Sequence, residues 1–332
     1  MKRNQGMKGE ILHLLQHASD YVSGQELSKI FGVSRTSIWK SIKALTDEGY
    51  EIEGIQKKGY RLVGANIGLS ASAIEAERVK KIMGRNVRCF EEVTSTNDLA
   101  KRFAEDGVEE GFLVVSDRQS AGRGRRGRNW SSPSGSGIYM SLILRPNIPA
   151  MKTPMITIIG GMAICKGVRK ITGLDAQIKW PNDVVINGKK ICGILTELSA
   201  EIDHVNYVVL GIGINVNTEE FPEEIKDTAT SLKIESKKTL SRIELINCFL
   251  EEFERLYQCF IQDGSLGGLV EEYDRLLVNR DREVYIIEGE KKKKALAKGI
   301  TKEGHLRIVN QDGVEEEVMS GEVSVRGIYG YV

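Results

Sequence analysis

The sequence predicts an α+β protein in three parts: an N-terminal winged helix-turn-helix, a central mixed β-sheet with packed helices, and a small C-terminal β-barrel. Three observations support this prediction. Two short helices flank a glycine turn near the N-terminus, strand and helix patterns alternate in the middle, and short strand-like runs with glycine turns follow from about residue 279. We expect domains at residues 1–64, 70–275 and 279–332, because 332 residues suffice for several hydrophobic cores.

Composition limits the classes of partner. The net charge is +1, so any polyanion must bind to a local patch of basic residues. The longest apolar stretch, Met155–Cys165, contains two glycines and is too short to span a bilayer, and the sequence shows no signal-peptide pattern. The five cysteines form no C-x-x-C pair. An odd number of cysteines without such pairs is typical of a reducing compartment, so we expect a cytoplasmic protein without membrane association.

The first part carries the signals of a helix-turn-helix. Ser23 and Glu26 form a capping box that begins one short helix, Gly32 ends that helix, and Ser34 can cap a second one. The apolar side of the second helix carries Ile38, Ile42 and Leu45. A short helix, a tight turn and a longer helix with an apolar side predict a compact two-helix unit.

Polar and basic residues occupy the outward side of the second helix, and residues 50–55 and 60–63 predict a hairpin with a basic tip behind it. Helix, turn, helix and basic wing in this order indicate DNA binding, with the second helix in the major groove. The alternative is a small helical adaptor whose lysines are only solvated. The residues expected to contact DNA are Ser34, Arg35, Thr36, Ser37, Lys40, Lys43, Lys57 and Lys58.

The middle part alternates strand and helix patterns. Strand candidates are residues 111–116, 138–144, 176–180, 184–187, 190–198 and 205–216, and helix candidates are residues 97–106, 154–171 and 241–262. Three strands in succession between Gln177 and Val216, with an Asn187-Gly188 hairpin turn, favour a mixed sheet over a doubly wound parallel one. In the last part, Lys291–Lys294 are interpreted as a solvated strand or hairpin tip.

The segment Gly122–Arg128 contains four arginines and three glycines. Its glycines match G-x-G-x-x-G, but the dinucleotide fingerprint needs a strand that runs into the first glycine and a helix that begins at the third. Here the apolar strand Phe112–Val115 ends well before Gly122, and no helix is expected after Gly127. The pattern therefore predicts a mobile cationic loop followed by Trp130, with a solvated basic turn or a nonspecific nucleic-acid contact as the alternative.

Three further motifs place polar residues where sites usually lie. Lys179 is expected at a strand end, where Pro181 stops the strand and leaves Asn182 and Asp183 in a turn. A lysine suits a carboxylate or phosphate and the aspartate suits nucleotide-bound Mg²⁺, whereas a solvated turn is the alternative. "GIGINVN" (residues 211–217) combines glycines, for close backbone approach, with amide donors. "STN" (residues 95–97) begins a helix, and its alternative role is plain N-capping.

Taken together, "STN", "RQSAGRGRRGRNW", "KWPND", "GILTE" and "GIGINVN" behind a winged helix-turn-helix closely resemble the bifunctional biotin protein ligases that are also biotin operon repressors. The resemblance covers all three parts. It implies a class II synthetase-like catalytic domain and an SH3-like C-terminal barrel. It also implies joining of biotin to ATP as biotinyl-5′-AMP, and transfer of biotin to a lysine of the carrier protein of acetyl-CoA carboxylase or another biotin-dependent carboxylase.

The resemblance also implies residue roles. Biotin binding is carried over to Ser95, Thr96, Asn97, Gln119, Arg123, Gly124, Arg125 and Lys179. ATP binding is carried over to Arg125, Arg128, Trp130, Asn182, Asp183 and Asn215, with Trp130 stacked on adenine. The catalytic residues are Lys179, Arg123, Arg125 and Asp183, and Asp183 would hold Mg²⁺ through the nucleotide. Arg326 ranks below these as a nucleotide contact. Further expectations are operator DNA as partner and a homodimer promoted by biotinyl-5′-AMP.

Two other functions stay open at this point. A transcription factor could sense a small acid through a ligase-like domain that has lost activity, although the intact Lys179, Asp183 and arginine loop argue against it. A lipoate ligase shares the ancestral fold, although the unbroken arginine loop and "KWPND" favour biotin. Biotin-dependent exchange of pyrophosphate into ATP distinguishes a biotin ligase from the inactive sensor. Competition between substrates distinguishes it from a lipoate ligase.

Overall fold

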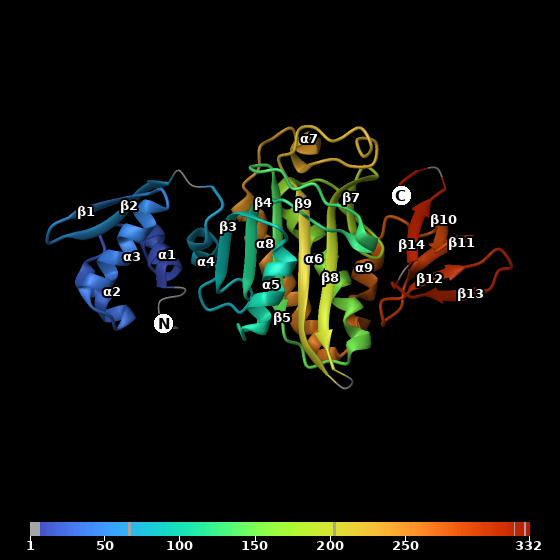
Figure 1. The fold of residues 1–332 in the computed structure, drawn as a ribbon, viewed down its shortest axis with the longest axis horizontal. Helices are drawn as coiled ribbons and strands as arrows, with labels where there is room; N and C mark the ends of the chain where they lie inside the picture. The colour runs from blue at the N-terminus through green and yellow to red at the C-terminus, as the bar shows by residue number, and fades with distance from the viewer. Residues whose placement is uncertain (1–6, 66–67, 202–203, 322, 329) are drawn as a thin grey trace.

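The computed structural model describes residues 7–65, 68–201, 204–321, 323–328 and 330–332. Its three parts follow one another along the long axis of the molecule, with the N-terminal helices at one end and the C-terminal sheet at the other (Figure 1). The predicted α+β class with a winged helix-turn-helix, a mixed sheet and an all-β C-terminal part is confirmed. No helix among the described residues is apolar over a length that would cross a bilayer.

The N-terminal part folds as the capping signals predict. Ser23 Oγ accepts a hydrogen bond from Glu26 N at 3.0 Å, Gly32 ends the helix with φ 63°, and Ser34 Oγ accepts one from Ser37 N at 3.2 Å. The elements are α1 (Met7–His17), α2 (Gly24–Phe31), α3 (Arg35–Asp47), β1 (Tyr50–Ile55) and β2 (Gly59–Ala65). Antiparallel pairing of β1 and β2 forms the predicted wing, and the predicted apolar side of α3 is buried.

A short helix, α4 (Ala71–Ala76), joins the N-terminal part to the centre. Ala73 and Ala76 are buried in the same apolar cluster as the cores of α1 and α3, and Ile243 of the central part packs against that cluster. Gly9 in α1 permits the close crossing, because a Cβ there would lie 2.5 Å from the Glu75 Cβ. The segment that begins at residue 70, where the central domain was predicted to start, thus contributes Ala73 and Ala76 to the N-terminal core and Ile74 to the central one.

The central sheet has seven strands in the order β3-β4-β5-β9-β8-β7-β6. The strands are β3 (Val87–Val93), β4 (Leu113–Gln119), β5 (Gly137–Leu144), β6 (Gln177–Lys179), β7 (Asp183–Ile186), β8 (Lys189–Ala200) and β9 (Val205–Asn215). Only the β3–β4 pair is parallel among these, which confirms a mixed sheet. The strand β3 was not predicted, and β4 was predicted to end at residue 116, whereas it continues to Gln119 and so carries that side chain to the site.

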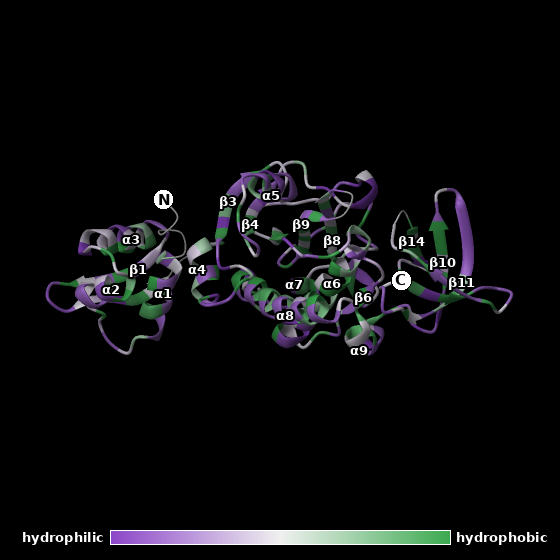
Figure 2. Ribbon diagram, turned by 90° about the horizontal axis from the view of Figure 1, so that it is seen from below, coloured by the Kyte–Doolittle hydropathy of each residue, from purple (hydrophilic) through white to green (hydrophobic). Residues whose placement is uncertain are grey.

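Helices cover both faces of this sheet, as Figure 2 shows. The helix α5 (Thr96–Glu105) packs on one face with β4, β5 and β9, and α6 (Pro154–Thr172) and α8 (Arg242–Asp263) pack on the other. Because α6 lies between the sheet and α8, it is apolar nearly all round. The short helices α7 (Leu232–Ser236) and α9 (Val270–Leu276) were not predicted, since neither is long enough to show helical periodicity.

The C-terminal part is an antiparallel sheet in the order β13-β12-β11-β10-β14. Its strands are β10 (Arg282–Glu288), β11 (Lys291–Ile300), β12 (Leu306–Val309), β13 (Glu315–Val318) and β14 (Val323–Gly327). Residues 291–294 begin β11, where they are exposed or half-buried, as predicted. Trp180 Nε1 donates to the Gly304 carbonyl at 3.1 Å, so a fully buried indole anchors this part to the central sheet.

Candidate active site

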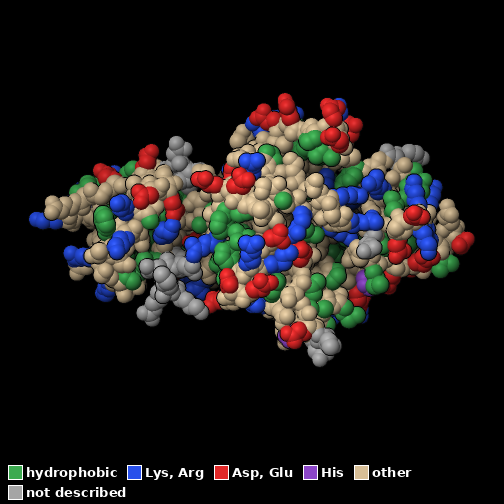
Figure 3. Space-filling model, in the orientation of Figure 1, with side chains coloured by type: hydrophobic (Ala, Val, Ile, Leu, Met, Phe, Trp, Pro, Cys, Tyr) green, Lys and Arg blue, Asp and Glu red, His purple; other side chains and the backbone are tan. Residues whose placement is uncertain are grey.

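Two adjoining cavities lie beside the arginine loop, which we define as residues 122–130. The larger, of about 270 Å³, lies between the central and C-terminal parts, and the smaller, of about 50 Å³, lies over β8 and β9. Lys and Arg side chains gather on the visible face where these two parts meet (Figure 3). The residues that line both cavities are Gly124, Arg125, Trp130, Asn182 and Lys190. A ligand with two chemically different halves can therefore span them.

The smaller cavity is lined by a connected polar network. Thr96 donates to Gln119 Oε1 through its backbone N, at 2.8 Å, and through its hydroxyl, at 3.1 Å. Ser141 Oγ lies 2.8 Å from Thr96 Oγ1 and 2.6 Å from Asn97 Oδ1, and Asn97 Nδ2 donates to Glu197 at 2.7 Å. These bonds fix the side chains of the "STN" motif, so the cavity presents neutral polar groups in set directions.

Ser95 precedes this network at the start of α5. It occupies the N-cap position, but its side chain makes no capping hydrogen bond, and it is 3% exposed. Since the residue lines the smaller cavity, its hydroxyl is available to a ligand there. The alternative of plain N-capping does not describe this side chain.

Two glycines of β9 allow other side chains to lie against the sheet. A Cβ on Gly211 would overlap Asn97 Oδ1, and a Cβ on Gly213 would lie 2.5 Å from Trp130 Cε2. Close approach to the backbone was predicted at "GIGINVN", and the side chains of Asn97 and Trp130 make this approach. The glycines thus set the depth of the smaller cavity.

Trp130 separates the two cavities. Its ring lies over Gly193 and Gly213, and Lys190 Nζ is 5.2 Å from the ring centroid. The indole Nε1 is buried and has no hydrogen-bond partner among the described residues. A buried donor without a partner is costly, so this position favours a ligand that supplies an acceptor.

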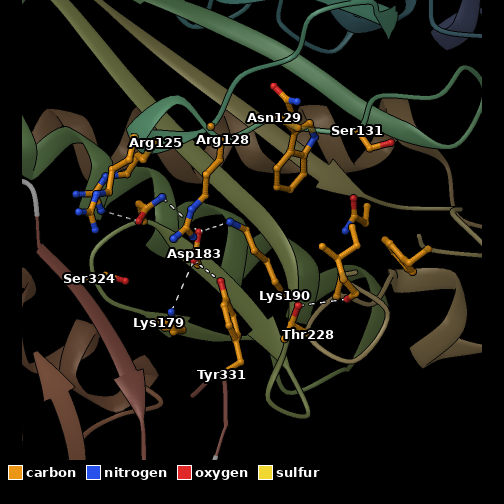
Figure 4. A pocket seen from close by; sticks show the side chains of 18 of the residues that line it. Arg125, Arg128, Asn129, Ser131, Lys179, Asp183, Lys190, Thr228, Ser324 and Tyr331 are labelled. Carbon is orange, nitrogen blue, oxygen red and sulfur yellow. Dashed lines mark hydrogen bonds and ion pairs between the residues drawn. The ribbon is translucent and has the colours of Figure 1, made fainter. Parts of the chain in front are cut away.

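The arginine loop is closed by its own backbone. Gly124 N donates to the Arg128 carbonyl at 2.7 Å, and Trp130 N donates to the Gly122 carbonyl at 2.9 Å. Arg123 pairs with Asp98 beside the smaller cavity. Arg128 lines the larger cavity, where it is labelled in Figure 4.

Arg125 connects the loop to the rest of the protein. Its guanidinium donates to Asn182 Oδ1 at 2.9 Å and to the carbonyls of Ser320 and Gly321 at 2.6 and 2.5 Å. Burial lowers the pKa of this guanidinium, but from a value so high that the group stays charged. One side chain therefore links the loop, the "KWPND" turn and the C-terminal part.

Lys179 and Asp183 lie in the wall of the larger cavity (Figure 4). Lys179 Nζ is 3.9 Å from Asp183 Oδ2, and Lys190 Nζ is 2.6 Å from Asp183 Oδ1. Burial lowers the pKa of Lys179 to about 8, although the Asp183 carboxylate opposes this. Burial alone would raise the pKa of Asp183, but Lys190 and Lys179 outweigh it and lower that pKa. Two cations and one carboxylate thus share a site with little solvent.

The segment between β9 and α7 adds apolar side chains to the larger cavity. Phe221, Pro222, Ile225 and Ala229, from the segment between β9 and α7, line it together with Asn215. Asn215 Nδ2 donates to the Thr230 carbonyl at 3.1 Å and so holds this segment. Cationic and apolar side chains in one cavity suit a molecule that combines phosphates with a flat heterocycle.

The structure brings most of the predicted site residues together. Seven of the eight residues predicted for biotin line the smaller cavity: Ser95, Thr96, Asn97, Gln119, Arg123, Gly124 and Arg125. Lys179 does not; it lines only the larger cavity, because its strand β6 is two strands away from β8. The larger cavity is lined by all six residues predicted for ATP, namely Arg125, Arg128, Trp130, Asn182, Asp183 and Asn215, and by Arg326.

Sequence reasoning missed several lining residues. Lys190 follows the predicted hairpin turn, and no motif in the sequence distinguishes it from its neighbour Lys189, which lines neither cavity. Phe221 and Pro222 are an apolar pair in an acidic segment, which is a usable signal. Tyr331 reaches the cavity from the end of β14, and no local pattern indicates this.

The predicted DNA-contacting residues lie on α3 and on the hairpin. All are exposed except Ser37, which is half-buried, and basic side chains lie at the hairpin tip (Figure 3). Trp39 was missed: it is 51% exposed on α3, and Lys43 Nζ is 5.6 Å from its ring. A basic helix face and a basic wing tip on one domain suit a polyanionic partner.

Comparison with known proteins agrees with this architecture. Family models match at residues 9–61 (HTH domain), 89–215 (Biotin/lipoate A/B protein ligase family) and 281–326 (Biotin protein ligase C terminal domain). A Biotin protein ligase from Aquifex aeolicus, solved in complex with biotin and ATP, has a TM-score of 0.65 and 33% identity. The match covers 73% of this chain and 99% of that one.

Curated relatives match over nearly the whole length. The Bifunctional ligase/repressor BirA of Bacillus subtilis (strain 168) is 40% identical, over 93% of this chain and 96% of the relative. The protein of the same name from Escherichia coli (strain K12) is 30% identical, over 92% of this chain and 94% of the relative. A DNA-binding head, a ligase domain and a C-terminal β-domain define the class. The chain belongs to the family of bifunctional ligase/repressors.

Proposed function

We propose that this protein is a biotin protein ligase that also represses transcription. It joins biotin and ATP to biotinyl-5′-AMP and pyrophosphate, then transfers biotin to a lysine of a biotin carboxyl carrier protein, of acetyl-CoA carboxylase or of another biotin-dependent carboxylase. The observation that carries the proposal is the pair of adjoining cavities, one with neutral polar groups and one cationic, divided by Trp130 and shared by Arg125.

Electrostatics explains the density of cations. Attack of a carboxylate on the α-phosphate of ATP brings two anions together, and unit charges 4 Å apart repel by about 4 kcal/mol at an effective dielectric constant of about 20. Lys179, Arg125 and Arg128 lie around the larger cavity and offset this repulsion. Lys179 lies between the biotin carboxylate and the α-phosphate. The acceptor amine then attacks the acyl carbon of the mixed anhydride, so that an amide forms and AMP leaves. Positioning suffices, and no protein nucleophile is needed.

Biotin occupies the smaller cavity, where Ser95, Asn97 and Gln119 bond its ureido group. A volume of about 50 Å³ is far below the roughly 300 Å³ of typical ligand pockets, so entry requires the arginine loop to move outward. Arg123 then closes over the ligand. Closure excludes water from the anhydride, which would otherwise hydrolyse.

ATP occupies the larger cavity. Trp130 stacks on adenine, and Phe221 and Pro222 add apolar lining beside it. Asn182 and Asn215 bond the phosphates, and Arg326 extends the cationic wall. The donor set suits Mg²⁺ that arrives with the nucleotide: Asp183 and Glu220 line the cavity, while the described residues hold no cluster of three acidic or metal-ligating side chains. When bound, Mg²⁺ neutralises phosphate charge, and Asp183 is the protein carboxylate that would hold it.

Pyrophosphate exchange tests the ligase activity. The wild-type protein should incorporate labelled pyrophosphate into ATP only when biotin is present, and it should then label a carrier domain with biotin. Absence of biotin-dependent exchange would favour a ligand sensor without activity. Exchange driven better by lipoate than by biotin would favour a lipoate ligase.

The N-terminal part couples the ligase reaction to the control of transcription. We propose that biotinyl-5′-AMP orders the arginine loop, that the ordered loop promotes a homodimer, and that two winged heads then bind operator DNA more tightly than one. Footprinting on the promoter of the host's own biotin genes should show protection that increases when biotin and ATP are added. Equal protection with and without them would contradict this regulation. Such a protein acts in the cytoplasm, where carrier and chromosome meet, and all five of its cysteines are free.

A further inference from the structure

Tyr331 of the C-terminal part touches both central residues of the larger cavity. Its hydroxyl donates to Asp183 Oδ2, and its ring centroid is 3.9 Å from Lys179 Nζ (Figure 4). The matched C-terminal domain ends at residue 326, so this tyrosine lies beyond the segment that defines the domain. No role is assigned to it by the motifs.

The end of the chain is packed in place. A Cβ on Gly327 would overlap the Val332 carbonyl oxygen, and one on Gly188 would lie 3.2 Å from Val332 Cγ2. The tail therefore lies between β14 and the β7–β8 hairpin. Tyr331 lines the larger cavity, which still has a volume of about 270 Å³, so the ring forms wall and leaves room for a nucleotide.

The contacts restrict two side chains that would otherwise move. Lys179 carries its ammonium on a flexible four-carbon stem, and that ammonium contacts the Asp183 carboxylate on one side and the Tyr331 ring face on another. Asp183 is itself held by Lys190 and by the tyrosine hydroxyl. An aromatic face attracts an ammonium, and it does so more strongly where water is excluded.

We propose that Tyr331 is a positioning residue for the adenylation step, holding the Lys179 ammonium where the carboxylate and the α-phosphate meet. The proposal rests on the ligase function proposed above. It makes the C-terminal part a contributor to the reaction centre and gives the ring, more than the hydroxyl, the main role.

Two variants test it. Tyr331→Leu keeps apolar volume in the tail but removes the aromatic face, and Tyr331→Phe keeps the face. In biotin-dependent pyrophosphate exchange, Tyr331→Leu should lower kcat roughly 30-fold, the factor equivalent to ~2 kcal/mol for a desolvated cation–π contact. KM for biotin should stay within about 2-fold, and Tyr331→Phe should retain kcat within about 5-fold. Unchanged biotin binding by calorimetry shows that both variants are folded.

Tyr285→Leu is the matched control, because its ring holds Lys292 Nζ at 3.7 Å in the same domain and does not line the cavity. It should exchange as the wild type does. The proposal is overturned if Tyr331→Leu keeps wild-type kcat, if it lowers KM for ATP at unchanged kcat, as a blocking residue would, or if Tyr331→Phe is as defective as Tyr331→Leu. A wild-type protein without exchange would instead contradict the ligase function itself.

Discussion

The shape of the smaller cavity depends on the absence of a side chain at Gly211. Gly211→Ala would force Asn97 away from β9, because the new Cβ would overlap its Oδ1. We expect biotin affinity to fall at least about 10-fold, as one oriented hydrogen bond is lost, with ~1–3 kcal/mol lower unfolding free energy. Calorimetry and thermal unfolding measure the two effects.

A second glycine provides the control for this substitution. Gly161 lies inside α6, and a Cβ there would meet Ile178 at 3.7 Å, which is ordinary contact. Gly161→Ala should bind biotin normally and be as stable as the wild type or up to ~1 kcal/mol more stable, because alanine favours the helix. Equal biotin affinity in the two variants would mean that Asn97 is not set by Gly211.

Lys179 should be needed for rate more than for folding. Lys179→Gln removes the buried cation of the larger cavity, and loss of one such electrostatic group typically costs roughly 10²–10³-fold in kcat. Pyrophosphate exchange measures the loss. Lys189→Gln, ten residues along and outside both cavities, should exchange normally. A similar decline in both variants would mean that general charge, not this ammonium, governs the rate.

At the scale of elements, the β1–β2 hairpin should supply phosphate contacts. Lys57 and Lys58 are exposed at its tip, and each phosphate contact adds about 0.9 to the slope of log affinity against log salt. The double alanine variant should bind all DNA sequences more weakly and lower that slope by about 2. Titrations at several salt concentrations measure it. The pair Lys291→Ala and Lys292→Ala, on β11, should leave the slope unchanged.

Elements with strong local signals were predictable. Ser23, Gly32 and Ser34 mark the ends of α2 and α3 because caps act within one turn, and the long apolar pattern of α6 identifies it without any tertiary information. The strand β3 was not predictable, because it is a sheet edge whose glutamates and arginine face outward, so neither alternation nor an apolar run appears.

The site itself was predictable only in part. The motifs contain most residues of the walls, at strand ends, within β8 and β9, and in the arginine loop. They placed Lys179 among the biotin-binding residues, although it lines only the larger cavity, and they did not identify Lys190 or Tyr331. These placements depend on the order of strands in the sheet and on the docking of the C-terminal part, neither of which is encoded within a local window.

At the scale of the whole molecule, Glu75 should make the joint between the N-terminal and central parts sensitive to pH. Burial raises the pKa of this carboxyl to about 7, although the Val87 N–H, at 2.9 Å, lowers it. The unfolded chain releases this proton near pH 4.5, so the folded state holds more protons between about pH 4.5 and 7. The unfolding free energy should therefore fall as pH rises through that window.

Glu75→Gln removes the buried charge and keeps an acceptor for Val87 N. It should raise the unfolding free energy at pH 8 by up to about 3 kcal/mol and have a much smaller effect at pH 5. Urea unfolding at the two pH values measures this difference. An equal gain at both would show that the carboxyl is not neutral in the folded protein at low pH.

The joint at α4 also affects how the protein could be divided. Removing residues 7–65 would expose to water the sides of Ala73, Ala76 and Ile243 that face the N-terminal apolar cluster. The remaining catalytic part would expose an apolar patch where the N-terminal part had been, and such a patch promotes self-association. A truncated enzyme without the N-terminal part should therefore also carry polar substitutions at the exposed apolar positions of α4.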